Sequence, residues 1–84
     1  METRDAVRAF IIGNFLFGDA AGLAGDSVSL LDNGIMDSLG VMELVGFLER
    51  ELQIKVPDTD LVPQNLDSVD NLVAYVEKRR SAAA

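Results

Sequence analysis

The sequence predicts an all-α fold, a small bundle of three main helices and one short helix. Apolar residues recur at spacings of three and four in three separate segments, the spacing that gives a helix one buried face. Glycine, proline and aspartate interrupt the chain between these segments. The chain has 84 residues, 49% of them apolar, which is enough for one compact core. We assign residues 1–80 to a single domain and expect residues 81–84 to form a disordered tail.

The first helix is predicted over residues 3–17. Thr3 is suited to cap its start, Asp5 suits its first turn, and Gly18 is a natural stop. The apolar residues cover a wide arc, so much of this helix should be buried: Val7, Phe10, Ile11, Ile12, Phe15, Leu16 and Phe17.

Residues 19–36 form a long, glycine-rich connection. Loops of this length are uncommon and usually functional. Six apolar side chains should hold this one against the core: Leu23, Val28, Leu30, Leu31, Ile35 and Met36.

The second helix, over residues 37–52, has the strongest pattern. Asp37 or Ser38 can cap it. Its apolar face is formed by Val41, Leu44, Val45, Leu48 and Leu52.

The rest of the chain predicts one short helix and one long helix. Residues 53–56 alternate polar and apolar, which allows a strand, but no other segment offers it a partner. Pro63 suits the start of a short helical turn. A final helix is predicted over residues 67–79, capped by Asp67 or Ser68, with an apolar face of Val69, Leu72, Val73 and Val76.

The composition excludes several functional classes. The chain has no histidine and no cysteine, so Ser-His-Asp and Cys-His arrangements, disulfides and thiolate metal sites are impossible. A net charge of −7 is the wrong sign for a nucleic-acid binder. We therefore expect neither an enzyme with its own active site nor a nucleic-acid partner.

The acidic charge is concentrated in the middle of the chain. Residues 19–70 carry eleven acids against Arg50 and Lys55. This suits encounters with basic partner surfaces, and the alternative interpretation is that the acidity serves solubility alone. No apolar run is long enough to span a membrane and the N-terminus lacks the basic start of a signal peptide, so we expect a cytoplasmic protein.

Ser38 is the candidate for chemistry, because it follows the long loop and opens the strongest helix. Its hydroxyl has no base within this chain to activate it, so another protein would have to supply the catalyst. The alternative is that Ser38 is only an N-cap.

The residues around Ser38 resemble the modification site of acyl carrier proteins. The likeness is carried by the run Ile-Met-Asp-Ser-Leu-Gly-Val-Met-Glu-Leu-Val at residues 35–45, and it extends over about residues 4–78. It implies a free-standing, monomeric carrier in which a separate transferase attaches 4′-phosphopantetheine to Ser38, with Asp37 and Leu39 beside it. Acyl groups would then be carried as thioesters in fatty-acid, polyketide or specialised acyl metabolism. The partners implied are the phosphopantetheinyl transferase, an acyl-activating ligase, and acyltransferase or synthase enzymes.

The resemblance also implies a docking surface on the second helix. Its candidate residues are Leu39, Gly40, Met42, Glu43, Gly46, Glu49 and Arg50. Gly40 and Arg50 depart from the acids that the family often has there. A second set could line a pocket for an acyl chain or simply form core: Val41, Leu44, Val45, Leu48, Leu66 and Val73.

Two alternatives remain open. The nearer one keeps the carrier chemistry with an amino acid as cargo, as in D-alanyl or peptidyl carriers, and the weakened acidic face hints at it. The more distant one is an unmodified helical interaction module.

Overall fold

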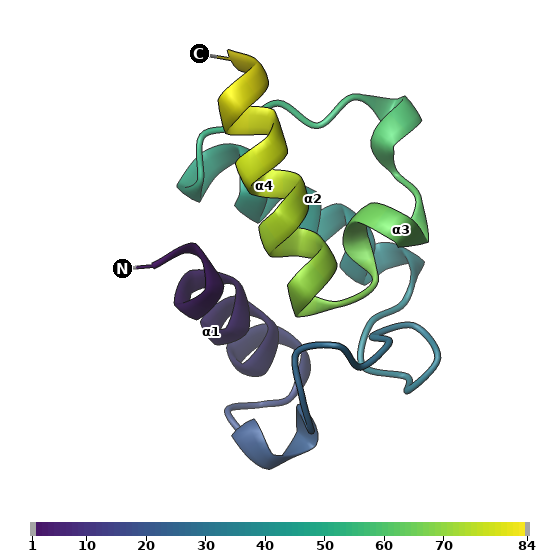
Figure 1. Cartoon of the computed structure of the whole chain (residues 1–84). Coiled ribbons are helices and arrows are strands. Elements are labelled where there is room, and N and C mark those ends of the chain that lie inside the picture. The colour runs from purple at the N-terminus through teal and green to yellow at the C-terminus, as the bar shows by residue number, and fades with distance from the viewer. Residues whose placement is uncertain (1, 84) are drawn as a thin grey trace.

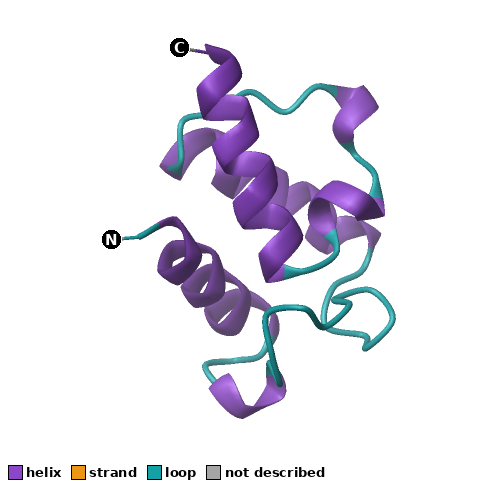
Figure 2. Ribbon diagram, viewed as in Figure 1, coloured by secondary structure: helices purple, strands orange, loops and turns teal. Residues whose placement is uncertain are grey.

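The computed structural model describes residues 2–83, and within that range every regular element is helical (Figures 1 and 2). The α-helices are α1 (Thr3–Phe15), α2 (Ser38–Glu51), the short α3 (Pro63–Leu66) and α4 (Val69–Ala83). Single 3-10 turns occur at Ala20–Gly22 and Asp58–Asp60. The predicted all-α fold with three long helices and one short helix is confirmed. None of the helices in residues 2–83 is both long and apolar enough to cross a membrane.

The core lies where α4 meets the other helices. α4 packs against α1 and α3, while α1 also contacts α2 (Figure 1). The side chains fully shielded from solvent come from all three long helices and from the loop: Val7, Ile11, Leu30, Leu44, Leu48, Leu72, Val69 and Val76. The periodic apolar positions of the sequence therefore do form one core.

The first helix ends two residues earlier than predicted. Its last residue is Phe15, and Phe17 is 96% exposed, so its predicted burial is wrong. The cause is a tight turn in which Phe17 and Gly18 both have positive φ, of 54° and 84°. Gly18 donates its N–H to the Ile12 carbonyl at 2.9 Å, which stops the helix as expected of that glycine. At the other end, Glu2 rather than Thr3 occupies the N-cap position.

The long connection between α1 and α2 packs against the core at several points along its length. Leu23, Leu30 and Met36 are buried as predicted, whereas Leu31 is exposed, so its predicted role in holding the loop is wrong. Leu30 donates its N–H to the Asp67 carbonyl at 2.8 Å, and this bond fixes the backbone so that the next side chain points outward.

Asp26 ties the same loop to two helices. Its carboxylate accepts hydrogen bonds from Arg4 and Arg8 of α1, and its carbonyl accepts the N–H of Asp70 in α4 at 2.9 Å. Burial alone would raise the pKa of the Asp26 carboxyl, but the hydrogen bonds from Arg4 and Arg8 outweigh it and lower that pKa below 3.8. The loop is thus a fixed part of the fold.

Residues 53–56 do not form a strand, since every regular element within residues 2–83 is helical and Gln53 has a positive φ of 56°. Ile54 and Val56 are buried, while Gln53 and Lys55 are exposed, so the side chains alternate as in a strand. The backbone here bonds to helices instead: Arg79 and Arg80 of α4 donate to the Lys55 and Leu52 carbonyls at 3.0 and 3.1 Å, and the Glu49 carboxylate of α2 accepts the N–H of Val56 at 3.2 Å.

The last helix starts and ends later than predicted. Ser68 is the cap, since its hydroxyl accepts the N–H of Asn71 at 3.0 Å, and the Asp67 carboxylate bonds to the long loop instead. The helix continues through Ala83, so residues 81–83 are helical where a tail was expected. Alanine has the highest helix propensity of any residue, which favours this extension. Ala84 lies outside the described residues.

Candidate functional site

Ser38 occupies the first helical position of α2, and its neighbour Asp37 is the N-cap. The Asp37 carboxylate accepts the N–H of Gly40 at 2.8 Å, and its carbonyl accepts the N–H of Val41 at 2.9 Å. Asp37 therefore caps the helix without any help from the Ser38 side chain. The interpretation of Ser38 as a mere cap is wrong.

The Ser38 side chain is exposed, and the side-chain hydrogen bonds within residues 2–83 do not involve its hydroxyl. The N–H groups of Ser38 and Leu39 lie in the first turn of α2, where no carbonyl of the helix precedes them. Leu39 beside them is 77% exposed. Ser38 thus offers a free hydroxyl at a helix end with unsatisfied N–H donors.

The loop before Ser38 is held in place by the core. Met36 is buried two residues before it, and the N–H groups of Ile35 and Met36 both donate to the Leu30 carbonyl, at 2.9 and 3.1 Å. Leu30 is in turn bonded to Asp67, just before α4. The start of α2 is therefore fixed relative to the last helix.

Six of the seven docking candidates lie on the accessible side of α2. Four of them are spaced four, three and four residues apart, which places them in one line along the helix. We call this line the α2 stripe: Leu39, Glu43, Gly46 and Arg50. Met42, which is 57% exposed, and Glu49 lie on the adjoining part of the surface. The Glu49 carboxylate also accepts the N–H of Val56 at 3.2 Å.

The seventh candidate, Gly40, is buried where α2 meets Phe15 and Met36. A Cβ built there would lie 3.0 Å from both Met36 Cγ and Phe15 Cε1. The expectation that Gly40 belongs to an exposed docking face is therefore wrong. The end of α1 packs so closely on the start of α2 that this position has no room for a side chain.

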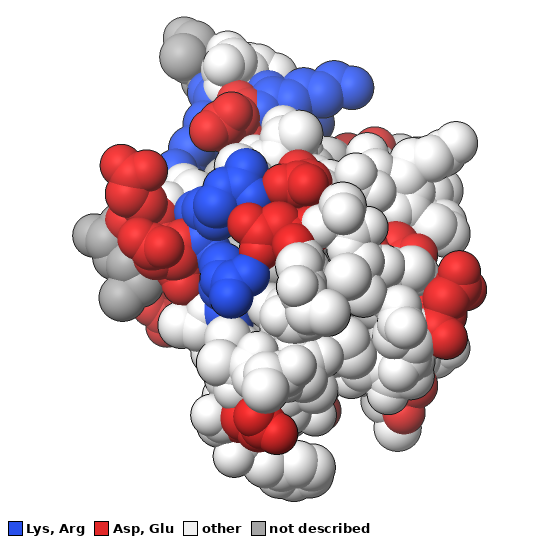
Figure 3. Space-filling model, turned by 60° about the horizontal axis from the view of Figure 1, so that its bottom comes forward, with Lys and Arg blue, Asp and Glu red and all other residues white. Residues whose placement is uncertain are grey.

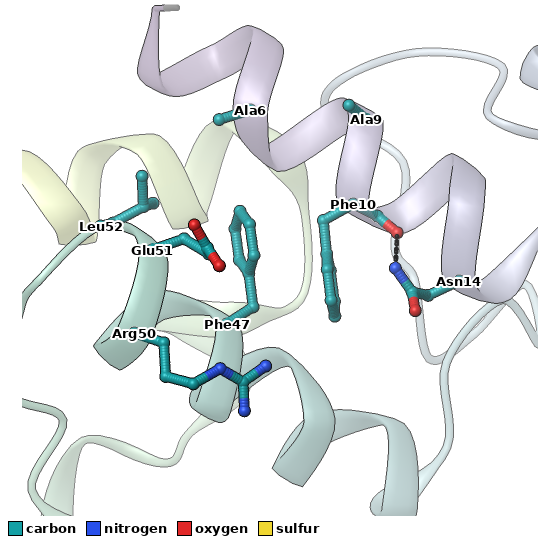
Figure 4. Close-up of a pocket in the computed structure, with 8 residues that line it drawn as sticks. All are labelled: Ala6, Ala9, Phe10, Asn14, Phe47, Arg50, Glu51 and Leu52. Atoms are coloured by element: carbon teal, nitrogen blue, oxygen red, sulfur yellow. Dashed lines mark hydrogen bonds between the residues drawn. The ribbon is translucent and has the colours of Figure 1, made fainter.

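The six acyl-pocket candidates lie in or against the hydrophobic core. Leu44, Val45, Leu48, Leu66 and Val73 are buried, and Val41 packs against them. A pocket of about 670 Å³ lies elsewhere, between α1 and α2, and none of the six lines it (Figure 4). Its walls are Ala6, Ala9, Phe10, Asn14, Phe47, Arg50, Glu51 and Leu52.

The sequence analysis missed this pocket. Phe10 and Phe47 face each other inside it, stacked with ring centroids 4.4 Å apart, and Arg50 and Glu51 lie at the same place (Figure 4). Ala6 and Ala9 are small, so α1 leaves the hollow open above the two rings. The sequence signals for this pocket were the small residues Ala6 and Ala9 near Phe10. Phe47 comes next to them only because α1 and α2 lie against each other in the fold.

Charged side chains are unevenly spread over the face shown in Figure 3. Basic groups gather on one side together with acids, and the other side carries acids and uncharged residues only. Arg4 and Arg8 pair with Asp26, and Arg4 also pairs with Asp70 at 2.6 Å.

Comparisons with known proteins agree with this geometry. The family model for the phosphopantetheine attachment site matches residues 16–76, a range that includes Ser38. An acyl carrier protein of Campylobacter jejuni is 32% identical over 77 residues, which cover 92% of this chain and 95% of that protein. D-alanyl carrier proteins of Streptococcus uberis and Streptococcus pyogenes are 36% and 38% identical over 53 residues, which cover 63% of this chain and 67% of each relative.

Members of this family are carriers and not catalysts, and they bear 4′-phosphopantetheine covalently on a serine. The family match covers well over half of the described fold, including all of α2 and α3 and most of α4. This chain belongs to the family of phosphopantetheine-binding carrier proteins.

Proposed function

We propose that Ser38 bears the 4′-phosphopantetheine arm and that the chain carries acyl groups as thioesters between partner enzymes. One observation supports this above the others. The Ser38 hydroxyl is exposed at the start of α2, and Asp37 leaves it free by taking the capping role.

The surroundings of Ser38 suit an attached phosphodiester. The N–H groups of Ser38 and Leu39 and the positive end of the α2 dipole favour an anion at this place. The attached group supplies a thiol, which this cysteine-free chain lacks. Asp37 holds the first turn of the helix in shape through Gly40, so the residues that receive the arm are in place before it is added.

Partner enzymes must do the chemistry, because the chain has no histidine and the carboxylate beside Ser38, that of Asp37, is bonded to the Gly40 N–H. The partners we propose are a phosphopantetheinyl transferase, an acyl-activating ligase, and acyltransferases or synthases. The α2 stripe and Met42 are the surface we propose for their docking, since these residues are accessible and continue directly from Ser38.

The test is the intact mass of the chain after incubation with coenzyme A, magnesium and a broad-specificity phosphopantetheinyl transferase. We expect a gain of one phosphopantetheinyl group in the wild type and none in Ser38→Ala. Ser27→Ala removes another exposed serine from the preceding loop and should still be modified. Modification of Ser38→Ala, or none in the folded wild type that starts unmodified, would refute the proposal.

A second candidate cargo is an amino acid attached to the same arm. The D-alanyl carrier proteins among the relatives favour it, and so does the absence of an acid at the exposed position of Arg50. The two cargoes are separated by offering the modified chain to a D-alanine-activating ligase and to an acyl-activating ligase, each with ATP. A mass gain of one alanyl group with the first and none with the second would replace the acyl proposal with this one.

A further inference from the structure

Phe17 is the one phenylalanine of the chain that the fold leaves outside its core. The other three are in mutual contact. Phe10 and Phe15 meet edge to face at 5.7 Å, and Phe10 stacks on Phe47. The Phe17 side chain is 96% exposed, the highest value among the large apolar residues that the structure describes as exposed.

The backbone at Phe17 is also one that a phenylalanine disfavours. Asp19 donates its N–H to the Leu16 carbonyl at 2.9 Å, which closes a turn with Phe17 and Gly18 at its centre. Both central residues have positive φ, as in a type I′ turn, where glycine and asparagine are preferred. Neither local conformation nor packing among residues 2–83 therefore explains a phenylalanine here.

The turn lies at the same end of the molecule as Ser38. Phe15, two residues before Phe17, is the residue whose ring lies over Gly40, which is two residues after Ser38. The exposed side chains Leu39 and Met42 flank Ser38 on α2. Phe17 thus adds an aromatic ring to an end of the molecule that already presents apolar groups around Ser38.

The stretch of chain that contains Phe17 and Ser38 carries charge of one sign. Residues 9–49 contain six acids and no lysine or arginine. Asp26 is paired with Arg4 and Arg8 of α1. The other five acids are exposed: Asp19, Asp32, Asp37, Glu43 and Glu49. A protein that docks here must meet acidic groups around exposed apolar ones, which calls for a basic surface that encloses an apolar socket.

We propose that Phe17 is a docking anchor for the phosphopantetheinyl transferase, inserting its ring into an apolar socket with a basic rim. This inference rests on the proposed function, because it takes its partner from the modification of Ser38. A large aromatic residue presented by a fixed turn is the kind of side chain that contributes most to interfaces, and insertion would bury a ring that is now exposed to water. The turn acts by holding the ring outward before the partner arrives.

The variant Phe17→Asn distinguishes an effect on docking from an effect on the stability of the fold. Asparagine suits the positive φ of this position, so the variant should have a thermal midpoint equal to or above that of the wild type. The variant lacks the ring, so the KM of the apo chain as substrate of the transferase should rise about tenfold while kcat stays the same. Added salt should raise the KM of both proteins in parallel, because the ring contributes no charge.

Two controls complete the experiment. Phe17→Tyr keeps the ring and should have a KM within about twofold of the wild type, and Ala20→Asn puts the same amide in the same exposed loop and should also change little. An unchanged KM in Phe17→Asn overturns the inference, and so does an equal rise in Ala20→Asn. A wild-type chain that is not modified at all instead overturns the proposed function.

Discussion

Asp37 and Ser38 are neighbours with different roles at the start of α2. The Asp37 carboxylate is bonded to the Gly40 N–H, while the Ser38 side chain is exposed and outside the core. Removing the cap should therefore cost stability, and removing the Ser38 hydroxyl should not. This difference makes Ser38→Ala a clean test of modification.

The capping role predicts the effect of Asp37→Ala. We expect it to lower the free energy of unfolding by about 1 kcal/mol, because the Gly40 N–H loses its acceptor. Asp37→Asn keeps an oxygen in that place and should cost much less. Urea denaturation of the unmodified proteins measures both, and an equal loss in the two variants would show that the charge, and not the cap, stabilises the helix.

Substitutions at Gly40 and Gly13 should change the free energy of unfolding in opposite directions. Gly40→Asp should lower the free energy of unfolding by at least about 2 kcal/mol, because the carboxylate would be pressed against Phe15 and Met36 without a partner. Gly13→Ala lies in α1 with open space around the new Cβ and should stabilise by about 0.5 to 1 kcal/mol. Denaturation curves in urea check both values. Tolerance of Gly40→Asp would mean that the two helices can separate at this point.

The burial of Gly40 and the exposure of Phe17 could not be predicted from the sequence, although other features of this site could. The Asp-Ser-Leu motif at residues 37–39 and its place at the start of a helix were predictable, because capping and periodicity are local properties. The burial of Gly40 was not, since it depends on where Phe15 of another helix lies. The exposure of Phe17 depends on a turn in which this residue has positive φ, and a phenylalanine in the sequence does not indicate such a turn.

At the scale of elements, the link between Tyr75 of α4 and Asp60 holds the segment before α3. The Tyr75 hydroxyl donates to the Asp60 carboxylate at 2.7 Å, and Asn65 donates to the Asp60 carbonyl at 3.0 Å. Burial, and then the hydrogen bond to Asp60, raise the pKa of Tyr75 to about 12. The folded state thus holds this proton more tightly than the unfolded state, whose tyrosine has a pKa of about 10.

The raised pKa gives Tyr75→Phe a pH-dependent effect. At neutral pH the lost hydrogen bond should cost about 1 kcal/mol. The stabilisation by Tyr75 is complete below pH 10 and is lost as the pH rises towards 12, so the difference between wild type and variant should narrow over that interval. Urea denaturation from pH 7 to 11 measures it. Tyr75 is the chain's single tyrosine, so absorbance reports its titration directly, and a titration near pH 10 in the folded protein would contradict the link.

The long helices were more predictable than the segments between them. Apolar residues at helical spacing gave all three, with ends displaced by a few residues. Residues 53–56 have the alternation of a strand, yet Arg79 and Arg80 satisfy two carbonyls at this place where a neighbouring strand would have done so. No local pattern announces a bond between residues that are 24 positions apart.

At the scale of the whole molecule, basic groups gather on one side of the face shown in Figure 3, whereas acids occur on both sides of it. Basic residues are confined to residues 4–8, 50–55 and 78–80, and several bond within the fold through Asp26, the Leu52 carbonyl and the Lys55 carbonyl. The acids nearest to Ser38 in the sequence, Asp32, Asp37 and Glu43, form no ion pair within residues 2–83. The acidic middle was visible in the sequence, but the pairing that removes Asp26 from the free surface required the folded arrangement.

The close packing of the core determines whether an acyl chain can be buried in it. Leu44, Leu48, Leu66 and Val73 are packed together between α2, α3 and α4, so a chain could enter only by moving these elements apart. Each methylene of the acyl group that is buried would contribute about 0.8 kcal/mol of favourable free energy, so a longer acyl group gains more from entering the core than a short one. The six acyl-pocket candidates stay a proposal on this ground, and chain length is the variable that tests them.

We expect the octanoyl-loaded chain to have a higher thermal midpoint than the acetyl-loaded chain, because only the longer cargo gains enough from burial to offset opening the core. Methyl NMR spectra of the two forms should differ at Leu48, Leu66 and Val73. Changes confined to the methyl groups of Ala6, Ala9 and Leu52 would instead place the chain in the pocket between α1 and α2, whose open volume requires no separation of helices. Equal midpoints and unchanged spectra would mean that the cargo stays in solvent, and that these six residues serve the fold alone.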